Sequence, residues 1–307
     1  MSCRRHVMLY NNFSAYLKRR YGKRIKKICI DGGFTCPNRD GKCGTGGCIY
    51  CGERGAGEHI TPEREISEQV KISIAALEDK ADGFIAYFQN FTNTYASAEV
   101  LKARYDAALC DERIVALAIG TRPDCIDEER AALITSYKER VDVWVELGLQ
   151  TASDETARVI NRGYGKKTFE QAVEMLKKYE IPTVVHLMIG LPGEGDRECE
   201  ELSEYISRFE LFGVKIHSVY VMKNTALETM YRQGEYTPPT MDEYIRRAAY
   251  IIARLSPDTV LHRLTGDCPS GLLVAPDWNT EKNAILRGIT EALEAKGLRQ
   301  GSLFKKS

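Results

Sequence analysis

Short apolar runs alternate with amphipathic stretches along the first two thirds of this chain. The runs are nearly continuous, as in Ile-Val-Ala-Leu-Ala-Ile at 114–119, and do not alternate apolar with polar residues. Such runs are typical of parallel strands that are covered on both faces. The pattern predicts strands at 25–30, 84–88, 114–119, 141–147, 183–189 and 215–222.

Amphipathic segments of helical period fill the intervals between these strands. Thr61 and Pro62 suit the start of one helix, because threonine caps a helix and proline fits its first position. Thr168 and Gln171 match a capping box, which would open a helix that runs to Tyr179. Successive strand centres lie roughly 30 residues apart, the length of one βα unit. Further helices are predicted at 9–21, 97–109, 127–137 and 196–211.

Six successive βα units fit an open doubly wound sheet or a barrel, whole or partial. In either fold the residues that follow the strands gather at one edge, where ligands bind. Past residue 225 the alternation stops, and Thr240 with Glu243 begins a further helix. We therefore expect an α/β main domain over 1–225 and a mostly helical C-terminal cap over 226–307. Polar clusters follow the predicted strands at 89–90, 122–124, 146–150 and 190–194.

The overall charge is balanced, with 43 basic and 43 acidic side chains, so it implies no particular partner. The distribution is uneven, however, because residues 1–30 hold nine lysines and arginines and no acid. A local basic surface of this kind favours a phosphate backbone, and a solvated face explains it equally well. The basic residues are Arg4, Arg5, Lys18, Arg19, Arg20, Lys23, Arg24, Lys26 and Lys27.

No stretch approaches the length of about 18 apolar residues that a membrane span requires. The N-terminus lacks the apolar segment of a signal peptide, so we expect a cytoplasmic protein without a membrane partner. Thiols stay reduced in that compartment. The ten cysteines are therefore read as ligands and small core residues instead of a disulfide framework.

Four of these cysteines lie within the sixteen residues of 36–51, a segment too rich in glycine and proline for regular structure. Such a loop cannot bury a core of its own, and clustered thiolates are soft ligands for a metal or a cluster. Four thiolates would satisfy a structural zinc. Three would leave one iron of a [4Fe–4S] cluster without a protein ligand, open to a cofactor. The cysteines are Cys36, Cys43, Cys48 and Cys51.

The loop Gly33-Phe-Thr-Cys36-Pro-Asn-Arg-Asp-Gly, followed by Gly-Thr-Gly-Gly-Cys48-Ile-Tyr-Cys51, resembles that of the radical S-adenosylmethionine (SAM) superfamily. The long first spacing is similar to the bacterial branch related to the radical domain of the Elongator catalytic subunit. This resemblance implies a partial (βα)6 TIM-like barrel and a [4Fe–4S] cluster on Cys36, Cys48 and Cys51. SAM would bind the open iron. Cys43 departs from the family pattern and is either a bystander or a surrogate ligand.

The resemblance also implies contacts to SAM at positions that match family motifs. Tyr50 would pack beside the adenine, and the pair Gln89 and Asn90 would hold the methionine amino group. Glu146 and Gln150 would bind the ribose hydroxyls. Two further contacts follow the fourth and fifth strands. Arg162 would bind the methionine carboxylate, and the segment from Gly190 to Glu194 would let the adenine approach the backbone.

The substrate implied by this branch is tRNA. Its members install or trim groups on the wobble uridine, and proteins like this chain are implicated in converting a carboxymethylaminomethyl group to aminomethyl. An electron donor such as flavodoxin or ferredoxin is implied as well. Two alternatives remain open, a radical SAM enzyme of a small metabolite and a zinc-stabilised nucleic-acid-binding module. His186 and His217 are expected to be core or barrel-lining residues, and no catalytic residue is assigned.

Overall fold

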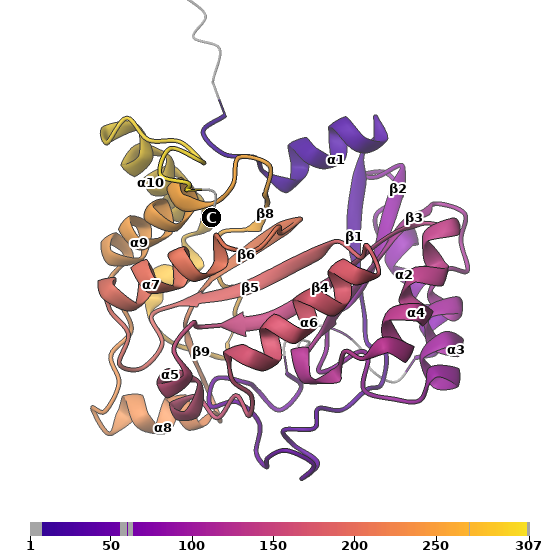
Figure 1. The fold of residues 1–307 in the computed structure, drawn as a ribbon, viewed down its shortest axis with the longest axis horizontal. Coiled ribbons are helices and arrows are strands. Elements are labelled where there is room, and N and C mark those ends of the chain that lie inside the picture. Colours follow the sequence, from indigo (N-terminus) through magenta and orange to yellow (C-terminus); the bar gives the residue numbers. More distant parts are fainter. Residues whose placement is uncertain (1–7, 56–59, 61–63, 270, 306–307) are drawn as a thin grey trace, which may run out of the picture.

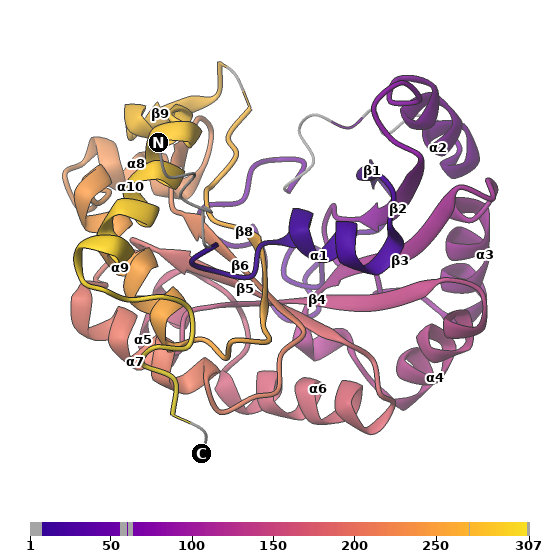
Figure 2. The same ribbon diagram turned by 90° about the horizontal axis from the view of Figure 1, so that it is seen from above.

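A single curled sheet of seven parallel strands forms the centre of the molecule (Figures 1 and 2). The computed structural model describes residues 8–55, 60, 64–269 and 271–305. The sheet has the order β1-β2-β3-β4-β5-β6-β8 and does not close, so it is a half-barrel. This confirms the predicted partial barrel. Its strands are β1 (Ile25–Ile30), β2 (Gly83–Phe88), β3 (Ile114–Thr121), β4 (Asp142–Gln150), β5 (Thr183–Ile189), β6 (Gly213–Ser218) and β8 (Val260–Arg263).

Helices cover the outer face of this sheet, as the buried apolar strands require (Figure 2). They are α2 (Ile66–Ala75), α3 (Ala98–Ala108), α4 (Glu128–Ser136), α5 (Asp154–Val159), α6 (Lys166–Lys178) and α7 (Asp196–Ile206). Short 3-10 turns occur at η1 (Pro123–Cys125), η2 (Tyr137–Glu139) and η3 (Asp277–Thr280).

The last part of the chain extends the same layers. It adds helices α8 (Ala226–Arg232), α9 (Met241–Arg254) and α10 (Lys282–Ala295). Helix α9 packs beside α7, and α10 packs beside α9. A separate two-stranded antiparallel sheet joins β7 (Val221–Met222) to β9 (Leu273–Ala275). The division at residue 225 stays a prediction.

Strand β8 is the seventh strand, one more than the six predicted. It lies within 226–307, the region expected to be a helical cap, and it pairs with the edge of β6. The sequence suggests a short strand and turn at 261–267, but so short an apolar run is not recognisable as a strand of the barrel. The free edge of β6 supplies the backbone partners that make it one.

Two predicted helix starts have different outcomes. Helix α6 begins at Lys166, so Thr168 lies inside it and the capping box predicted there is wrong. Instead, the Asp154 carboxylate accepts the Lys166 main-chain N–H at 2.8 Å, which satisfies one donor at the helix start. The predicted start at Thr61 and Pro62 lies outside the described residues.

Helix α1 (Phe13–Tyr21) closes the amino-terminal end of the half-barrel. Its aromatic side chains pack inside the sheet, where the Phe13 ring stacks on His262 at 4.0 Å and meets Trp144 edge-on at 6.1 Å. The Tyr21 hydroxyl donates to Asp142, the first residue of β4, at 2.7 Å. Figure 1 shows α1 at the opposite end of the strands from the loop that follows β1.

Of the helices described, none is long and apolar enough to cross a membrane.

Candidate functional site

The cysteine loop leaves β1 at the carboxyl edge of the sheet, the end where ligands of such folds bind. Main-chain hydrogen bonds fix its course, from Arg39 N to Cys36 O at 2.8 Å and from Cys51 N to Cys48 O at 3.0 Å. The Gly47 N–H also donates to Asn38 O at 2.9 Å. The loop is therefore a set of successive turns.

Residues from the α5 end hold this loop from outside. The Asn161 side-chain amide donates to Gly47 O at 2.7 Å and to Thr45 O at 3.2 Å. In return, the Asn38 amide donates to Asn161 O at 2.5 Å. Asn161 adopts a left-handed φ of 52°, which asparagine tolerates better than most residues. The loop is thus positioned by a contact with residues more than 100 positions away in sequence.

One predicted ligand, Cys48, lies in an environment that favours its thiolate. A hydrogen bond from the Cys51 thiol lowers the pKa of Cys48 to about 6, helped by Tyr50 and the charge of Arg122. The same bond raises the pKa of Cys51, since that thiol is the donor.

This donor set fits a cluster better than a single ion. Within the described residues, no three His, Cys, Asp or Glu side chains gather closely enough to hold one metal ion. The thiolates of a [4Fe–4S] cluster bind separate irons, so they need not converge on one point. Cys36, Cys48 and Cys51 would hold such a cluster, and their roles as ligands stay predictions.

Cys43 is exposed, unlike the half-buried Cys48 and Cys51. Its sulfur accepts a hydrogen bond from Arg122 Nη2 at 3.5 Å, and burial raises the pKa of its thiol. Arg122 also donates two hydrogen bonds, of 2.9 and 2.7 Å, to the Asp124 carboxylate. These contacts favour the bystander role for Cys43, and they show that Arg122 and Asp124 form a salt-bridged turn.

Buried acceptors follow β2 in a row. Asn90 donates to Asp31 at 2.9 Å, while its Oδ1 is buried and meets no donor among the described residues. The same holds, within that part of the chain, for Thr92 Oγ1 and Asn93 Oδ1. Buried acceptors without partners suit an ammonium group, in keeping with the predicted role of Asn90. Gln89 is half-buried beside it. Sequence reasoning missed Thr92 and Asn93, although a polar run directly after a buried strand is a usable signal.

Arg162 is fully buried, and most of its hydrogen bonds stabilise the main chain at the end of β4. Its Nη1 donates to the main-chain oxygens of Leu149 and Thr151, and its Nε to Tyr164 O at 3.0 Å. Only Nη2 has no hydrogen-bond partner among the residues described, at 3.7 Å from Asp154. A role in binding the methionine carboxylate stays a prediction and would use that one nitrogen.

Tyr164 organises the bulge at the end of β4. Its hydroxyl donates to Gly148 O at 2.6 Å and lies 3.3 Å from Gln150 Oε1, and Gln150 has a left-handed φ of 61°. The centroid of its ring lies 4.7 Å from the Arg122 guanidinium carbon and 4.6 Å from that of Arg162. Gln150 therefore lies in a turn that hydrogen bonds stabilise. Its role as a ribose contact stays a prediction.

Glu146 lies inside the half-barrel, with no exposed side-chain surface. Lys215 and His186 donate to its Oε2, the latter at 2.8 Å. Lys27 and the Trp144 indole both donate to its Oε1 at 3.2 Å. The predicted ribose role stays a prediction, and ribose hydroxyls would have to displace one of these four donors. His186 and His217 line the barrel, as expected.

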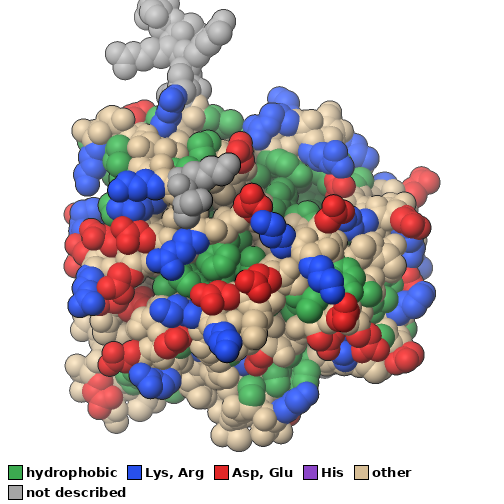
Figure 3. Space-filling model, in the orientation of Figure 1, with side chains coloured by type: hydrophobic (Ala, Val, Ile, Leu, Met, Phe, Trp, Pro, Cys, Tyr) green, Lys and Arg blue, Asp and Glu red, His purple; other side chains and the backbone are tan. Residues whose placement is uncertain are grey.

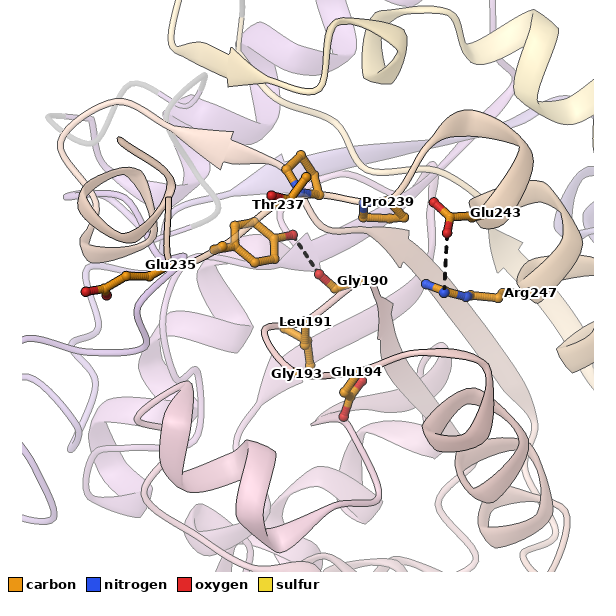
Figure 4. A pocket seen from close by; sticks show the side chains of 11 residues that line it. Gly190, Leu191, Gly193, Glu194, Glu235, Thr237, Pro239, Glu243 and Arg247 are labelled. Atoms are coloured by element: carbon orange, nitrogen blue, oxygen red, sulfur yellow. Dashed lines mark hydrogen bonds and ion pairs between the residues drawn. The ribbon is translucent and has the colours of Figure 1, made fainter. Parts of the chain in front are cut away.

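A cavity of about 300 Å³ lies beside Gly190 and Glu194 (Figure 4). The Tyr236 hydroxyl donates to Gly190 O at 2.6 Å. Gly190 has a φ of 97°, and a Cβ there would meet Pro239 at 2.6 Å. Glu194 accepts from Thr151, and burial raises the pKa of its carboxyl. The backbone at Gly190 thus approaches Pro239 closely, and the predicted adenine contact stays a prediction.

Tyr50 is half-buried beside the thiols of Cys48 and Cys51.

A half-barrel whose first strand runs into a loop of cysteines defines a class of enzymes that carry a cluster at the barrel mouth. The chain belongs to the radical SAM superfamily, whose profile matches residues 39–206, and its C-terminal domain profile matches residues 212–295. The first range includes Cys48 and Cys51 and begins just after Cys36. Its cofactors are accordingly a [4Fe–4S] cluster and SAM, and it requires an electron donor. This membership replaces the zinc alternative.

Similar proteins span bacteria and archaea. The chain is 33% identical over 300 residues to the uncharacterized protein YtqA of Bacillus subtilis, covering 97% of this chain and 93% of that one. It is 28% identical over 218 residues to the tRNA uridine(34) acetyltransferase of Dehalococcoides mccartyi, covering 70% and 46%. The structure of Methanocaldococcus infernus Elp3 superposes with a TM-score of 0.67 at 21% identity, over 90% of this chain and 64% of that one. The last match shows the shared fold.

Proposed function

We propose that this protein modifies tRNA by radical SAM chemistry, converting a carboxymethylaminomethyl group on the wobble uridine to aminomethyl. The observation that carries the proposal is the similarity, over 70% of this chain, to a protein named for its action on tRNA uridine 34. The match covers 46% of that relative, so its acetyl transfer is not part of the proposal. When bound, the cluster and SAM supply a 5′-deoxyadenosyl radical that can abstract a substrate hydrogen.

The basic N-terminal segment gives this proposal less support than its sequence suggested. Arg20 is paired with Asp142, and Arg24 with Asp82, at 2.8 Å each. Helix α1, which carries Lys18, Arg19 and Arg20, lies at the amino-terminal end of the strands, opposite the cysteine loop (Figure 1). Arg4 and Arg5 lie outside the described residues. RNA that reaches the cysteine loop would therefore meet side chains other than those of α1.

Charges on the outer surface are mixed. Figure 3 shows lysines and arginines interspersed with acids over the face it presents. Arg158 on α5 and Lys167 on α6 are exposed and make no ion pair with other described residues. Both belong to the segments next to Asn161, which holds the cysteine loop. We infer that recognition of RNA depends on the loops around the mouth of the barrel.

A nucleoside profile of bulk tRNA tests the proposal. Deleting the gene should remove aminomethyl-type wobble uridines and accumulate the carboxymethylaminomethyl form, because that group is no longer trimmed. A Cys48→Ala copy should fail to restore the profile, whereas Cys43→Ala, the matched control, should restore it. Unchanged nucleosides in the deletion strain would refute the tRNA proposal. Formation of 5′-deoxyadenosine by the purified protein would then favour a small-metabolite substrate.

A further inference from the structure

A layer of ionisable side chains crosses the interior of the half-barrel. It lies between the apolar core that packs against α1 and the mouth of the barrel at the carboxyl edge of the sheet. In β6, Lys215 points inward to Glu146 on β4. Arg263 is the register partner of Lys215, so it projects from the same face of the sheet. The layer comprises Lys27, Tyr87, Glu146, His186, Lys215, His217 and Arg263.

This layer carries more positive than negative charge. Glu146 is its one acid within the described residues, and it accepts hydrogen bonds from both Lys215 and Lys27. Burial lowers the pKa of Lys215 to about 7. Arg263 has no acid of its own among the described residues. The histidines add no charge, since burial lowers the pKa of His186 to about 4 and that of His217 well below its ordinary value. A half-buried lysine that shares its carboxylate with Lys215, near an arginine without an acid, leaves this layer able to accept an anion.

Donors in the layer are also left unused. His217 Nε2 is buried and has no hydrogen-bond partner in the described part of the chain. The Arg263 guanidinium is exposed and makes no ion pair with any described residue. Lys27 Nζ and Lys215 Nζ each lie 4.3 Å from the centroid of the Tyr87 ring.

The layer faces the cysteine loop. Inward-facing residues nearer the carboxyl edge keep partial exposure, among them Cys29 and Met188, while those nearer the amino-terminal end are buried against α1. Arg263 is the last residue of β8, so it lies toward the carboxyl edge of the sheet, from which the cysteine loop leaves β1.

We propose that Arg263, His217 and Lys27 form a binding site for a carboxylate of the substrate inside the half-barrel. This inference rests on the proposed function, in which the group to be trimmed ends in a carboxylate. An arginine fork suits that group because it can donate two parallel hydrogen bonds. Glu146 is a positioning residue, since it holds Lys27 and Lys215 and has no vacant site for the substrate.

The test compares two anticodon stem-loop RNAs, one with carboxymethylaminomethyl uridine and one with aminomethyl uridine. Binding to the reconstituted protein with SAM is measured by equilibrium dialysis. Wild-type protein should bind the carboxylate form about 10-fold tighter, the ratio of one good charged contact. Arg263→Gln should abolish this preference. Arg287→Gln, an exposed arginine on α10 that is 3.9 Å from Glu291, should keep it.

Cleavage of SAM without RNA provides the second readout. It should change less than about twofold in Arg263→Gln if the site serves the substrate. Equal binding of both stem-loops by the wild type, or neither bound, would overturn the carboxylate site. The proposal would also be overturned if Arg263→Gln weakened the binding of SAM as much as that of the carboxylate stem-loop. The site would then hold the carboxylate of SAM. The nucleoside profile of the deletion strain tests the proposed function separately.

Discussion

Asn38 and Asn161 hold the cysteine loop by reciprocal contacts. The Asn38 amide donates to Asn161 O at 2.5 Å, and the Asn161 amide donates to Gly47 O at 2.7 Å. One partner lies inside the loop and the other at the end of α5, so the chain segment after β4 determines where the thiols stand. Retention of the cluster should therefore depend on a residue that ligates nothing.

Replacing Asn161 tests this dependence. Asn161→Ala removes two side-chain hydrogen bonds and leaves at φ 52° a residue that tolerates the left-handed backbone less well than asparagine, for a cost of about 2 kcal/mol. Iron retained after anaerobic reconstitution and gel filtration should fall severalfold. Asn161→Gly removes the same bonds without the backbone strain and should retain more iron than Ala. Full iron content in both variants would show that the clamp is dispensable.

The three predicted ligands should be individually essential. Cys36→Ala, Cys48→Ala and Cys51→Ala should each reduce 5′-deoxyadenosine formation under dithionite by at least about 100-fold, because a cluster lacking a ligand is lost. Cys43→Ala should keep most of the activity, since that thiol contacts Arg122 instead. Loss of activity on removing Cys43 alone would contradict this choice of ligands.

The buried pair of Glu146 and Lys215 should be strongly coupled. Glu146→Gln leaves Lys215 buried without its counter-ion, which should cost about 3 kcal/mol of unfolding free energy. The double variant with Lys215→Met should lose about 1–3 kcal/mol less unfolding free energy than the two single variants lose together, as measured by urea unfolding. The exposed pair of Arg197 and Glu201 is the control, with an expected coupling below about 0.5 kcal/mol. Additive costs at Glu146 would refute the coupling.

The contact of α1 with Asp142 should make stability depend on pH. Hydrogen bonds from Arg20 and Tyr21 lower the pKa of the Asp142 carboxyl below its ordinary value of 3.8. The folded state therefore binds this proton less readily than the unfolded chain, and the contribution is present above pH 3.8 and lost as pH falls below it. Asp142→Asn should cost about 1 kcal/mol at pH 7 and far less near pH 3.

Urea unfolding of cluster-free protein at both pH values measures the Asp142 effect. Glu139→Gln, an exposed acid of η2, should change stability at neither pH. A cost of Asp142→Asn that stays constant between the two pH values would show that the carboxylate charge is not what α1 binds.

The sequence by itself determined the layout of the barrel and the chemistry at its mouth. Continuous apolar runs of about four to eight residues are typical of covered parallel strands, so β1 to β6 were predictable within a few residues. The resemblance of the cysteine loop to the radical SAM superfamily implied a cluster on Cys36, Cys48 and Cys51 before any geometry was known. Both features are local, because the residues that encode them are neighbours in the chain.

Only the tertiary structure decided which distant groups meet. The four residues of β8 become a strand because β6 offers a free edge, and Lys166 begins α6 because Asp154 caps it. Helix α1 with its basic residues proved to lie away from the mouth, since Phe13 packs inside the sheet. Burial and partners set the charge and role of a side chain, and neither is encoded by its neighbours in sequence. Glu146, surrounded by four donors from three other positions of the barrel wall and from its own strand, owes its role to that arrangement.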